Sequence, residues 1–141
     1  MKQVTSTPLR RLAGAFLVML ASCAPLLAET GEPARLARIE ASFWGDHRVE
    51  LHLPEPVAWR AFVVDGPPRL VVDVEAEGLE ADPSLLSGAI VGASAGRIAS
   101  GWSRLVLTME RTFAVRKAGL DEGVLAISLE RIGQGGFEKA A

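Results

Sequence analysis

The sequence contains few of the residues that metal and redox chemistry require. Of its 141 residues, one is cysteine and two are histidine. A zinc site usually takes four ligands, mainly from these two residue types, so we expect neither a metal site nor a cofactor. Tyrosine is absent as well, and the aromatic side chains are five phenylalanines and three tryptophans.

Positive charge is also scarce beyond the first 28 residues. From residue 29 onward the chain has 12 basic and 17 acidic residues, a net charge of −5. A net-acidic chain is not attracted to phosphate backbones, which argues against nucleic acid as a partner. With 49% hydrophobic and 23% charged residues, the composition is typical of one packed domain of ordinary size.

The sequence lacks a hydrophobic run long enough to suggest a membrane span. Residues 12–28 carry no charge but number only 17, whereas a spanning helix needs about 20 apolar residues. Three basic residues precede this stretch, within residues 1–11. The layout predicts a secretory signal peptide over residues 1–28, cleaved after Ala28, and hence a periplasmic domain; an uncleaved anchor is the alternative.

Two other export signals fit the same residues. Leu20–Ala21–Ser22–Cys23 resembles a bacterial lipoprotein box, in which acylated Cys23 would tether the protein to a membrane. The pair Arg10–Arg11 resembles part of a twin-arginine signal. Contact with a membrane is expected only if Cys23 is lipidated. With cleavage after Ala28 the mature chain has no cysteine, and no disulfide stabilises it.

Alternation with a period of two dominates the rest of the chain. Apolar residues Val49, Leu51 and Leu53 fall on one face of a predicted strand, and residues 105–109 and 125–129 repeat the pattern. Residues 70–74 are apolar on both faces, as in a central strand. The sequence therefore predicts an all-β fold.

Turn residues separate the predicted strands. Gly45–Asp46, Asp65–Gly66, Gly92, Gly96, Gly101 and residues 121–123 all have the residue types that turns favour. Asp65 and Asp121 are placed to accept hydrogen bonds from nearby backbone N–H groups. The one plausible helix spans residues 82–90, where Asp82 would cap its start and Pro83 would occupy the first position.

An internal repeat gives the architecture. A shift of 56 residues aligns residues 45–53 with 101–109, and the glycine, the arginine and all three inward apolar positions agree. The halves span about residues 34–75 and 95–131, each a unit of about four strands. Two such units bury their apolar faces most simply against each other, which predicts a pseudo-twofold β-sandwich of two small sheets.

The residues resemble a known family. Residues 35–39, 48–53, 56–62 and the run Asp65–Gly66–Pro67–Pro68–Arg69–Leu70–Val71–Val72–Asp73–Val74 look like the AMIN domain, and residues 101–107 resemble its second repeat. AMIN domains form the N-terminal, non-catalytic part of bacterial periplasmic N-acetylmuramoyl-L-alanine amidases and occur in some secretin-type proteins. The resemblance covers about residues 34–131.

The resemblance implies a function. AMIN domains pair two symmetric small β-sheets, bind peptidoglycan and hold a hydrolase at the site of cell division. The zinc-binding amidase domain would need well over a hundred further residues, whereas residues 132–141 read as a tail or truncated linker. We therefore expect a cell-wall targeting domain that is not itself an enzyme, with residues 29–131 as the AMIN-like domain.

Four arginines are candidates for binding peptidoglycan. Arg48 and Arg104 occupy equivalent positions in the repeat, and Arg60 and Arg116 form a second equivalent pair. A guanidinium group can bind carboxylates of the peptide stem or lactyl oxygens of the glycan. The alternative is that all four are solvated surface charges.

The tryptophans divide into two groups. Trp44 and Trp102 lie beside glycines in predicted turns, where an exposed ring could contact a sugar. Trp59 shares the parity of apolar neighbours and is expected in the core. Arg69 and Asp73, four apart on one strand face, are expected to form a structural ion pair, and His52 is expected on the surface.

Catalysis has little support in the sequence. No two of the carboxylates Glu50, Glu55 and Glu110 are marked as a pair across a cleft, and no nucleophile lies in a motif with a base. We expect no catalytic residue. The alternative function is assembly, in which exposed strand edges dock a division-site or envelope protein by strand addition.

Overall fold

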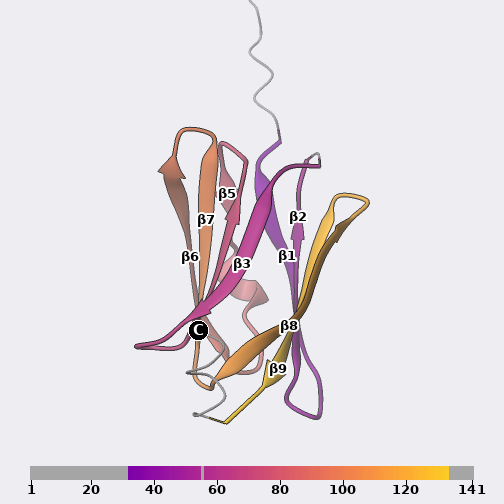
Figure 1. Ribbon diagram of the computed structural model, residues 1–141, viewed down its shortest axis with the longest axis vertical. Coiled ribbons are helices and arrows are strands. Elements are labelled where there is room, and N and C mark those ends of the chain that lie inside the picture. The colour runs from indigo at the N-terminus through magenta and orange to yellow at the C-terminus, as the bar shows by residue number, and fades with distance from the viewer. Residues whose placement is uncertain (1–31, 55, 134–141) are drawn as a thin grey trace, which may run out of the picture.

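The computed structural model describes residues 32–54 and 56–133, which form two layers of mainly antiparallel strands; only the short β5 pairs in parallel, with β1 (Figure 1). One sheet has five strands in the order β5-β1-β2-β9-β8, and the other has four in the order β3-β4-β7-β6. The expected all-β sandwich is confirmed. The elements are β1 (Ala34–Ala41), β2 (His47–His52), β3 (Trp59–Val64), β4 (Arg69–Val74), β5 (Leu79–Glu80), the 3-10 helix η1 (Pro83–Leu85), β6 (Ile90–Ala99), β7 (Trp102–Met109), β8 (Phe113–Asp121) and β9 (Val124–Arg131).

The internal repeat is present in the fold, but the halves interleave. By the repeat, β1 to β4 correspond to β6 to β9 in order. The β1–β2 hairpin joins the β8–β9 hairpin in the larger sheet, and the β6–β7 hairpin joins the β3–β4 hairpin in the smaller one. Each sheet is thus built from both halves, rather than one half forming each sheet. The second half begins at Ile90, earlier than the expected residue 95.

The strand registers obey the same pseudo-twofold relation. In the larger sheet Arg48 of β2 lies opposite Ser128 of β9. In the smaller sheet Arg104 of β7 lies opposite Asp73 of β4. The first residue of each pair matches under the shift of 56, and the second under a shift of 55. The two central strand pairs are therefore equivalent positions, which permits a residue-by-residue comparison of the two outer faces.

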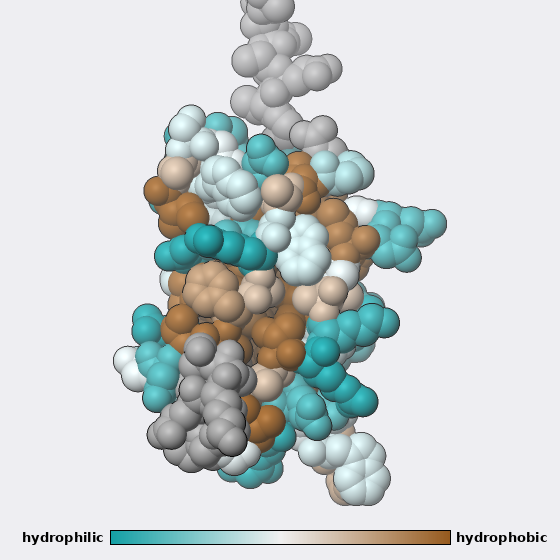
Figure 2. All heavy atoms as spheres, viewed as in Figure 1, coloured by the Kyte–Doolittle hydropathy of each residue, from teal (hydrophilic) through white to brown (hydrophobic). Residues whose placement is uncertain are grey.

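Alternating apolar residues fill the space between the sheets. The predicted inward residues of β2, β7 and β9 are buried, because each strand directs every second side chain to the same face. β4 is buried on both faces, as expected of a central strand. Figure 2 shows hydrophobic side chains between the layers and hydrophilic ones along their flanks. The fully buried residues at the centre include Val49, Leu51, Leu70, Val72, Leu105, Leu107, Leu125 and Ile127.

Some local predictions need correction. Gly92 and Gly96 lie within β6 and not in turns, since β6 runs along a sheet edge and carries an irregularity between Ile90 and Gly92. The predicted helix over residues 82–90 is a single 3-10 turn. Its start is as expected, with the Asp82 side chain accepting a hydrogen bond from the Ser84 N–H at 2.9 Å. That bond lowers the pKa of the Asp82 carboxyl group.

The predicted signal peptide, the lipoprotein cysteine Cys23 and most of the predicted tail lie outside the described residues. Within the described part of the chain, no helix is long and apolar enough to cross a membrane.

The symmetry of the core predicts equal sensitivity at matched positions. Leu51→Ala and Leu107→Ala should each lower the free energy of unfolding by about 2–5 kcal/mol, because each removes most of a fully buried leucine side chain and leaves a cavity in its place. Urea denaturation measures the loss, with the outward-facing Thr108→Ala as the control. A loss at Leu51 no larger than that of the control would contradict the register.

Candidate functional site

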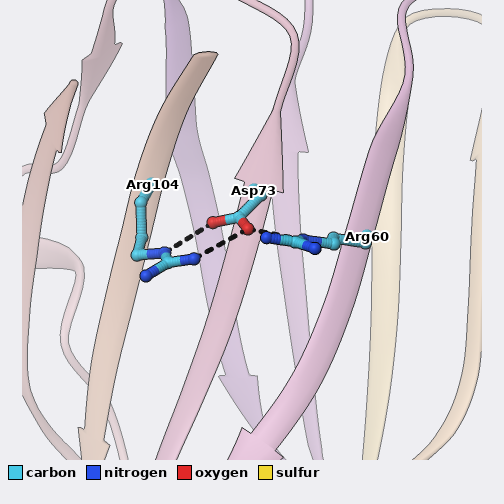
Figure 3. Close-up of polar contacts among 3 residues, drawn as sticks. All are labelled: Arg60, Asp73 and Arg104. Atoms are coloured by element: carbon cyan, nitrogen blue, oxygen red, sulfur yellow. Dashed lines mark hydrogen bonds and ion pairs between the residues drawn. The ribbon is translucent and has the colours of Figure 1, made fainter. Parts of the chain in front are cut away.

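Three strands of the smaller sheet bring two of the predicted arginines onto one acid (Figure 3). Arg104 donates from Nε to Asp73 Oδ1 at 2.7 Å and from Nη2 to Oδ2 at 2.9 Å. Arg60 donates from Nε to Asp73 Oδ2 at 2.6 Å. Asp73 lies directly opposite Arg60 in β3 and Arg104 in β7. We call these three residues the Asp73 triad.

Asp73 is the buried member of the triad. The Asp73 side chain has no exposed surface, whereas both guanidinium groups remain partly exposed. Hydrogen bonds from Arg104 hold the pKa of Asp73 below its ordinary value of 3.8, although burial acts in the opposite direction. The same contact raises the pKa of Arg104. Both arginines are therefore already occupied by a carboxylate of the chain itself.

The expected ion pair between Arg69 and Asp73 is absent. Residues four apart on a strand are separated by about 13 Å, because the backbone rises about 3.3 Å per residue. Arg69 instead donates to the carbonyl oxygens of Pro67 and Asp65. Asp73 finds its partners on neighbouring strands, which the sequence spacing within β4 does not reveal.

The equivalent position in the larger sheet has a different composition. Ser128 takes the place of Asp73, and Arg48 lies opposite it as Arg104 lies opposite Asp73. On the other side of Ser128, the residue opposite is Lys117. Arg48, Lys117 and Ser128 line a shallow depression of about 230 Å³. We call this group the Ser128 site.

A bulge in β8 explains why Lys117 and not Arg116 occupies this place. The register with β9 shifts between Val115 and Lys117, so that Arg116 is the extra residue. Arg60 therefore matches Lys117 in space, which corrects the expected equivalence of Arg60 and Arg116. Arg116 and Lys117 are both exposed, and neither forms an ion pair with any residue in 32–54 or 56–133.

Arg48 has one partner. Its Nε donates to Glu50 Oε1 at 2.8 Å, a contact between neighbours on the same face of β2. About half of the Arg48 side chain remains exposed, whereas the Glu50 side chain is 19% exposed. The contact uses Nε alone, so the Nη groups of Arg48 remain available to an added carboxylate.

Two aromatic rings project from the turn between β1 and β2. Phe43 is 94% exposed and Trp44 is 84% exposed, and the rings contact each other edge to face at 5.4 Å between centroids. The prediction that Trp44 lies exposed in a turn is confirmed. We call these two residues the aromatic tip; the turn that carries it lies at the lower end of the molecule in Figure 1.

A buried histidine, whose role the sequence did not suggest, holds this turn in place. His47 Nε2 accepts a hydrogen bond from the Ala89 N–H at 3.0 Å, which leaves the ring hydrogen on Nδ1 to donate to the Gly45 carbonyl oxygen at 3.0 Å. Its ring packs edge to face on Phe113. Gly45 has a positive φ of 93°, a conformation that glycine adopts without strain.

The turn also contacts the end of β9. The Asp46 carboxylate accepts a hydrogen bond from the Arg131 N–H at 3.4 Å. Ser128 lies three residues before Arg131 in β9, so it falls in the half of the larger sheet nearer the aromatic tip. The depression at the Ser128 site extends from there along β8 toward Asp121. The matching turn of the other half has Ala99 and Ser100 at the positions of Phe43 and Trp44.

The remaining predicted residues lie elsewhere. Trp102 is the first residue of β7 and is half-buried, so it is not an exposed turn residue as expected. Trp59 packs partly buried against the core, and His52 is exposed on β2. Asp65 accepts a hydrogen bond from the Gly66 N–H at 2.7 Å.

Another depression measures about 530 Å³ and is lined by prolines and by Glu32, Glu75 and Glu77. Among the described residues, no group of three or more histidine, cysteine or acidic side chains is placed to hold a metal ion. No protein-family model matches the chain, and no curated protein matches it.

The Asp73 triad predicts an acid-sensitive contribution to stability. Because folding lowers the pKa of Asp73, its contribution is fully present above pH 4 and is lost as the pH falls through the lower folded value. Asp73→Asn should reduce the free energy of unfolding by about 1–3 kcal/mol at pH 7, since charged hydrogen bonds are lost. In urea denaturation from pH 7 to pH 2, the gap between wild type and variant should close below pH 4. A gap independent of pH would show that the carboxylate charge does not matter.

Proposed function

We propose that this chain is an exported, non-catalytic domain of the AMIN type that binds peptidoglycan. The supporting observation is that the five-stranded sheet carries both exposed cations, Arg48 and Lys117, and, in its β1–β2 turn, exposed aromatic rings. Peptidoglycan offers both matching chemistries, because its glycan presents sugar C–H faces and its peptide stems carry carboxylates. The resemblance of residues 34–131 to the AMIN domain supports the same function.

The aromatic tip suits a sugar ring. Apolar C–H groups pack on an indole face while the hydroxyl groups at the rim remain in water. Since His47 and the contact of Asp46 with β9 hold the turn that carries the tip, the backbone of this turn loses little conformational freedom on binding. Export and a periplasmic location belong to the same proposal, with lipidation at Cys23 as the alternative anchor.

The test is co-sedimentation of residues 29–141 with isolated peptidoglycan sacculi. This fragment retains both sheets and the whole described core. The wild-type fragment should sediment with sacculi, and Trp44→Ala should lower its affinity by roughly fivefold or more, because an anchoring indole is removed. The stability of the variant should change by less than about 0.5 kcal/mol, since the ring is exposed.

Ile98→Ala is the matched control, because Ile98 is an exposed apolar residue on the other sheet. It should bind sacculi as well as the wild type does. A well-folded wild-type fragment that stays in the supernatant would refute the proposed function.

A second candidate function is docking of an envelope protein at a strand edge. β6 favours it, because this ten-residue edge strand exposes Val91 and Ile98 and carries one charged residue, Arg97. Unpaired edge strands accept an added strand from a partner. Failure to bind sacculi together with loss of a cellular partner in Ile98→Lys would favour docking over wall binding.

A further inference from the structure

Because of the pseudo-twofold relation, the outer face of one sheet can be compared position by position with the outer face of the other. At the Asp73 triad, a carboxylate lies between two cations that come from the strands on either side. At the Ser128 site, the same two neighbouring positions again hold cations, Lys117 and Arg48. The residue between them is neutral. The second face therefore has no carboxylate between its two cations, and its acids Glu50 and Asp121 lie beside them.

We propose that the Ser128 site binds a carboxylate group of the ligand, in the place that Asp73 fills on the other sheet. This inference rests on the proposed function, which supplies the carboxylate from the peptide stems of peptidoglycan. It restricts acid recognition to the five-stranded sheet. The four-stranded sheet, whose Arg60 and Arg104 are occupied by Asp73, takes no ligand acid.

Distances between opposite residues support the placement. Side chains directly opposite on antiparallel strands have Cβ atoms about 4.5–5.5 Å apart, so Arg48 and Lys117 both flank the space above Ser128. The short serine side chain leaves that space open, and its hydroxyl forms no hydrogen bond to another residue of the described part of the chain. It is free to donate to a carboxylate oxygen.

Arg48 has guanidinium donors that are not in use. Arg104 binds Asp73 through both Nε and Nη2, whereas Arg48 donates to Glu50 through Nε alone. The other acid beside Arg48 in the sheet, Glu40, is paired with Arg38 at 2.9 Å. A bound carboxylate therefore gains charge-assisted hydrogen bonds from the Nη groups of Arg48 and from Lys117, while Glu50 keeps its contact with Arg48 Nε. Asp121, which also lines the depression, is the other acid near it.

The decisive variant copies the residue of the other sheet. Ser128→Asp places an internal carboxylate between Arg48 and Lys117, and it should lower the affinity for native sacculi by about tenfold or more, since the ligand acid is replaced and repelled. Its unfolding midpoint in urea should be equal to or above that of the wild type, because the new acid finds two cations. A merely structural defect would instead lower both binding and stability.

The matched control adds the same charge elsewhere. Ser100→Asp lies in the exposed turn between β6 and β7 and should bind sacculi like the wild type. Equal losses of binding in both variants would show that net charge alone is responsible and would overturn the site.

A second comparison needs no variant. Sacculi treated with carbodiimide and ammonia carry amides in place of their carboxylates but keep their glycan. The wild-type fragment should bind these sacculi about tenfold more weakly. General electrostatics predicts the opposite change, because residues 29–141 are net acidic and repel an acidic polymer.

The outcomes separate the two proposals. Wild-type binding that is unaffected by amidation and by Ser128→Asp would overturn carboxylate recognition at this site and leave wall binding intact. No binding of the wild type to either preparation would overturn wall binding, and the carboxylate site with it.

Discussion

Pairing of β2 with β9 and of β4 with β7 connects the two halves of the chain within both sheets, and the other features depend on it. Each half supplies two hairpins, but neither hairpin pair forms a sheet by itself. An isolated two-stranded hairpin is at best marginally stable in water, whereas a sheet of four or five strands that buries an apolar face can be stable. The core therefore exists only when both halves are present, and the same pairing aligns the outer faces residue by residue.

That alignment shows that the two outer faces differ in one central residue, which is Asp73 in the smaller sheet and Ser128 in the larger one. A carboxylate without exposed surface must be paired, and Asp73 meets the requirement with Arg60 and Arg104. Ser128 at the equivalent position imposes no such requirement, so the cations beside it stay available. Two faces with the same strand pairing thus differ in how their cations are paired. The proposed acid recognition therefore falls on one face and not on both.

The sequence predicted much of the fold because periodicity reports which face of a strand is buried. It placed Val49, Leu51 and Leu53 on one face correctly and identified residues 70–74 as a central strand. It did not predict that the halves interleave, because an apolar stripe specifies the buried face and not the neighbouring strand. The pairing of Asp73 depends on that neighbour, which is why Arg69 was the wrong partner.

The bulge at Arg116 escaped detection for a related reason. The shift of 56 aligned Asp65 with Asp121 by residue type, although beyond the bulge the strands match under a shift of 57 and Asp121 is equivalent to Val64. Arg60 was therefore paired with Arg116 instead of Lys117. The exposure of Trp44 was predictable, since it stands beside a turn glycine. Trp102 stands beside one too, but it starts a strand and packs there.

A net-acidic domain can still recognise an acidic polymer when its cations are concentrated at one place. Charges more than about 8–10 Å apart are largely screened in physiological salt, so the potential at Ser128 depends on Arg48 and Lys117 together with the nearby acids Glu50 and Asp121. The aromatic tip, in the turn before β2, would add a contact of different chemistry. A sugar or a carboxylate alone binds only weakly, but a ligand that carries both, joined at a short distance, gains from the high effective concentration of its second group. Under the proposed function, selectivity for a glycopeptide would follow from the need to satisfy both contacts at once.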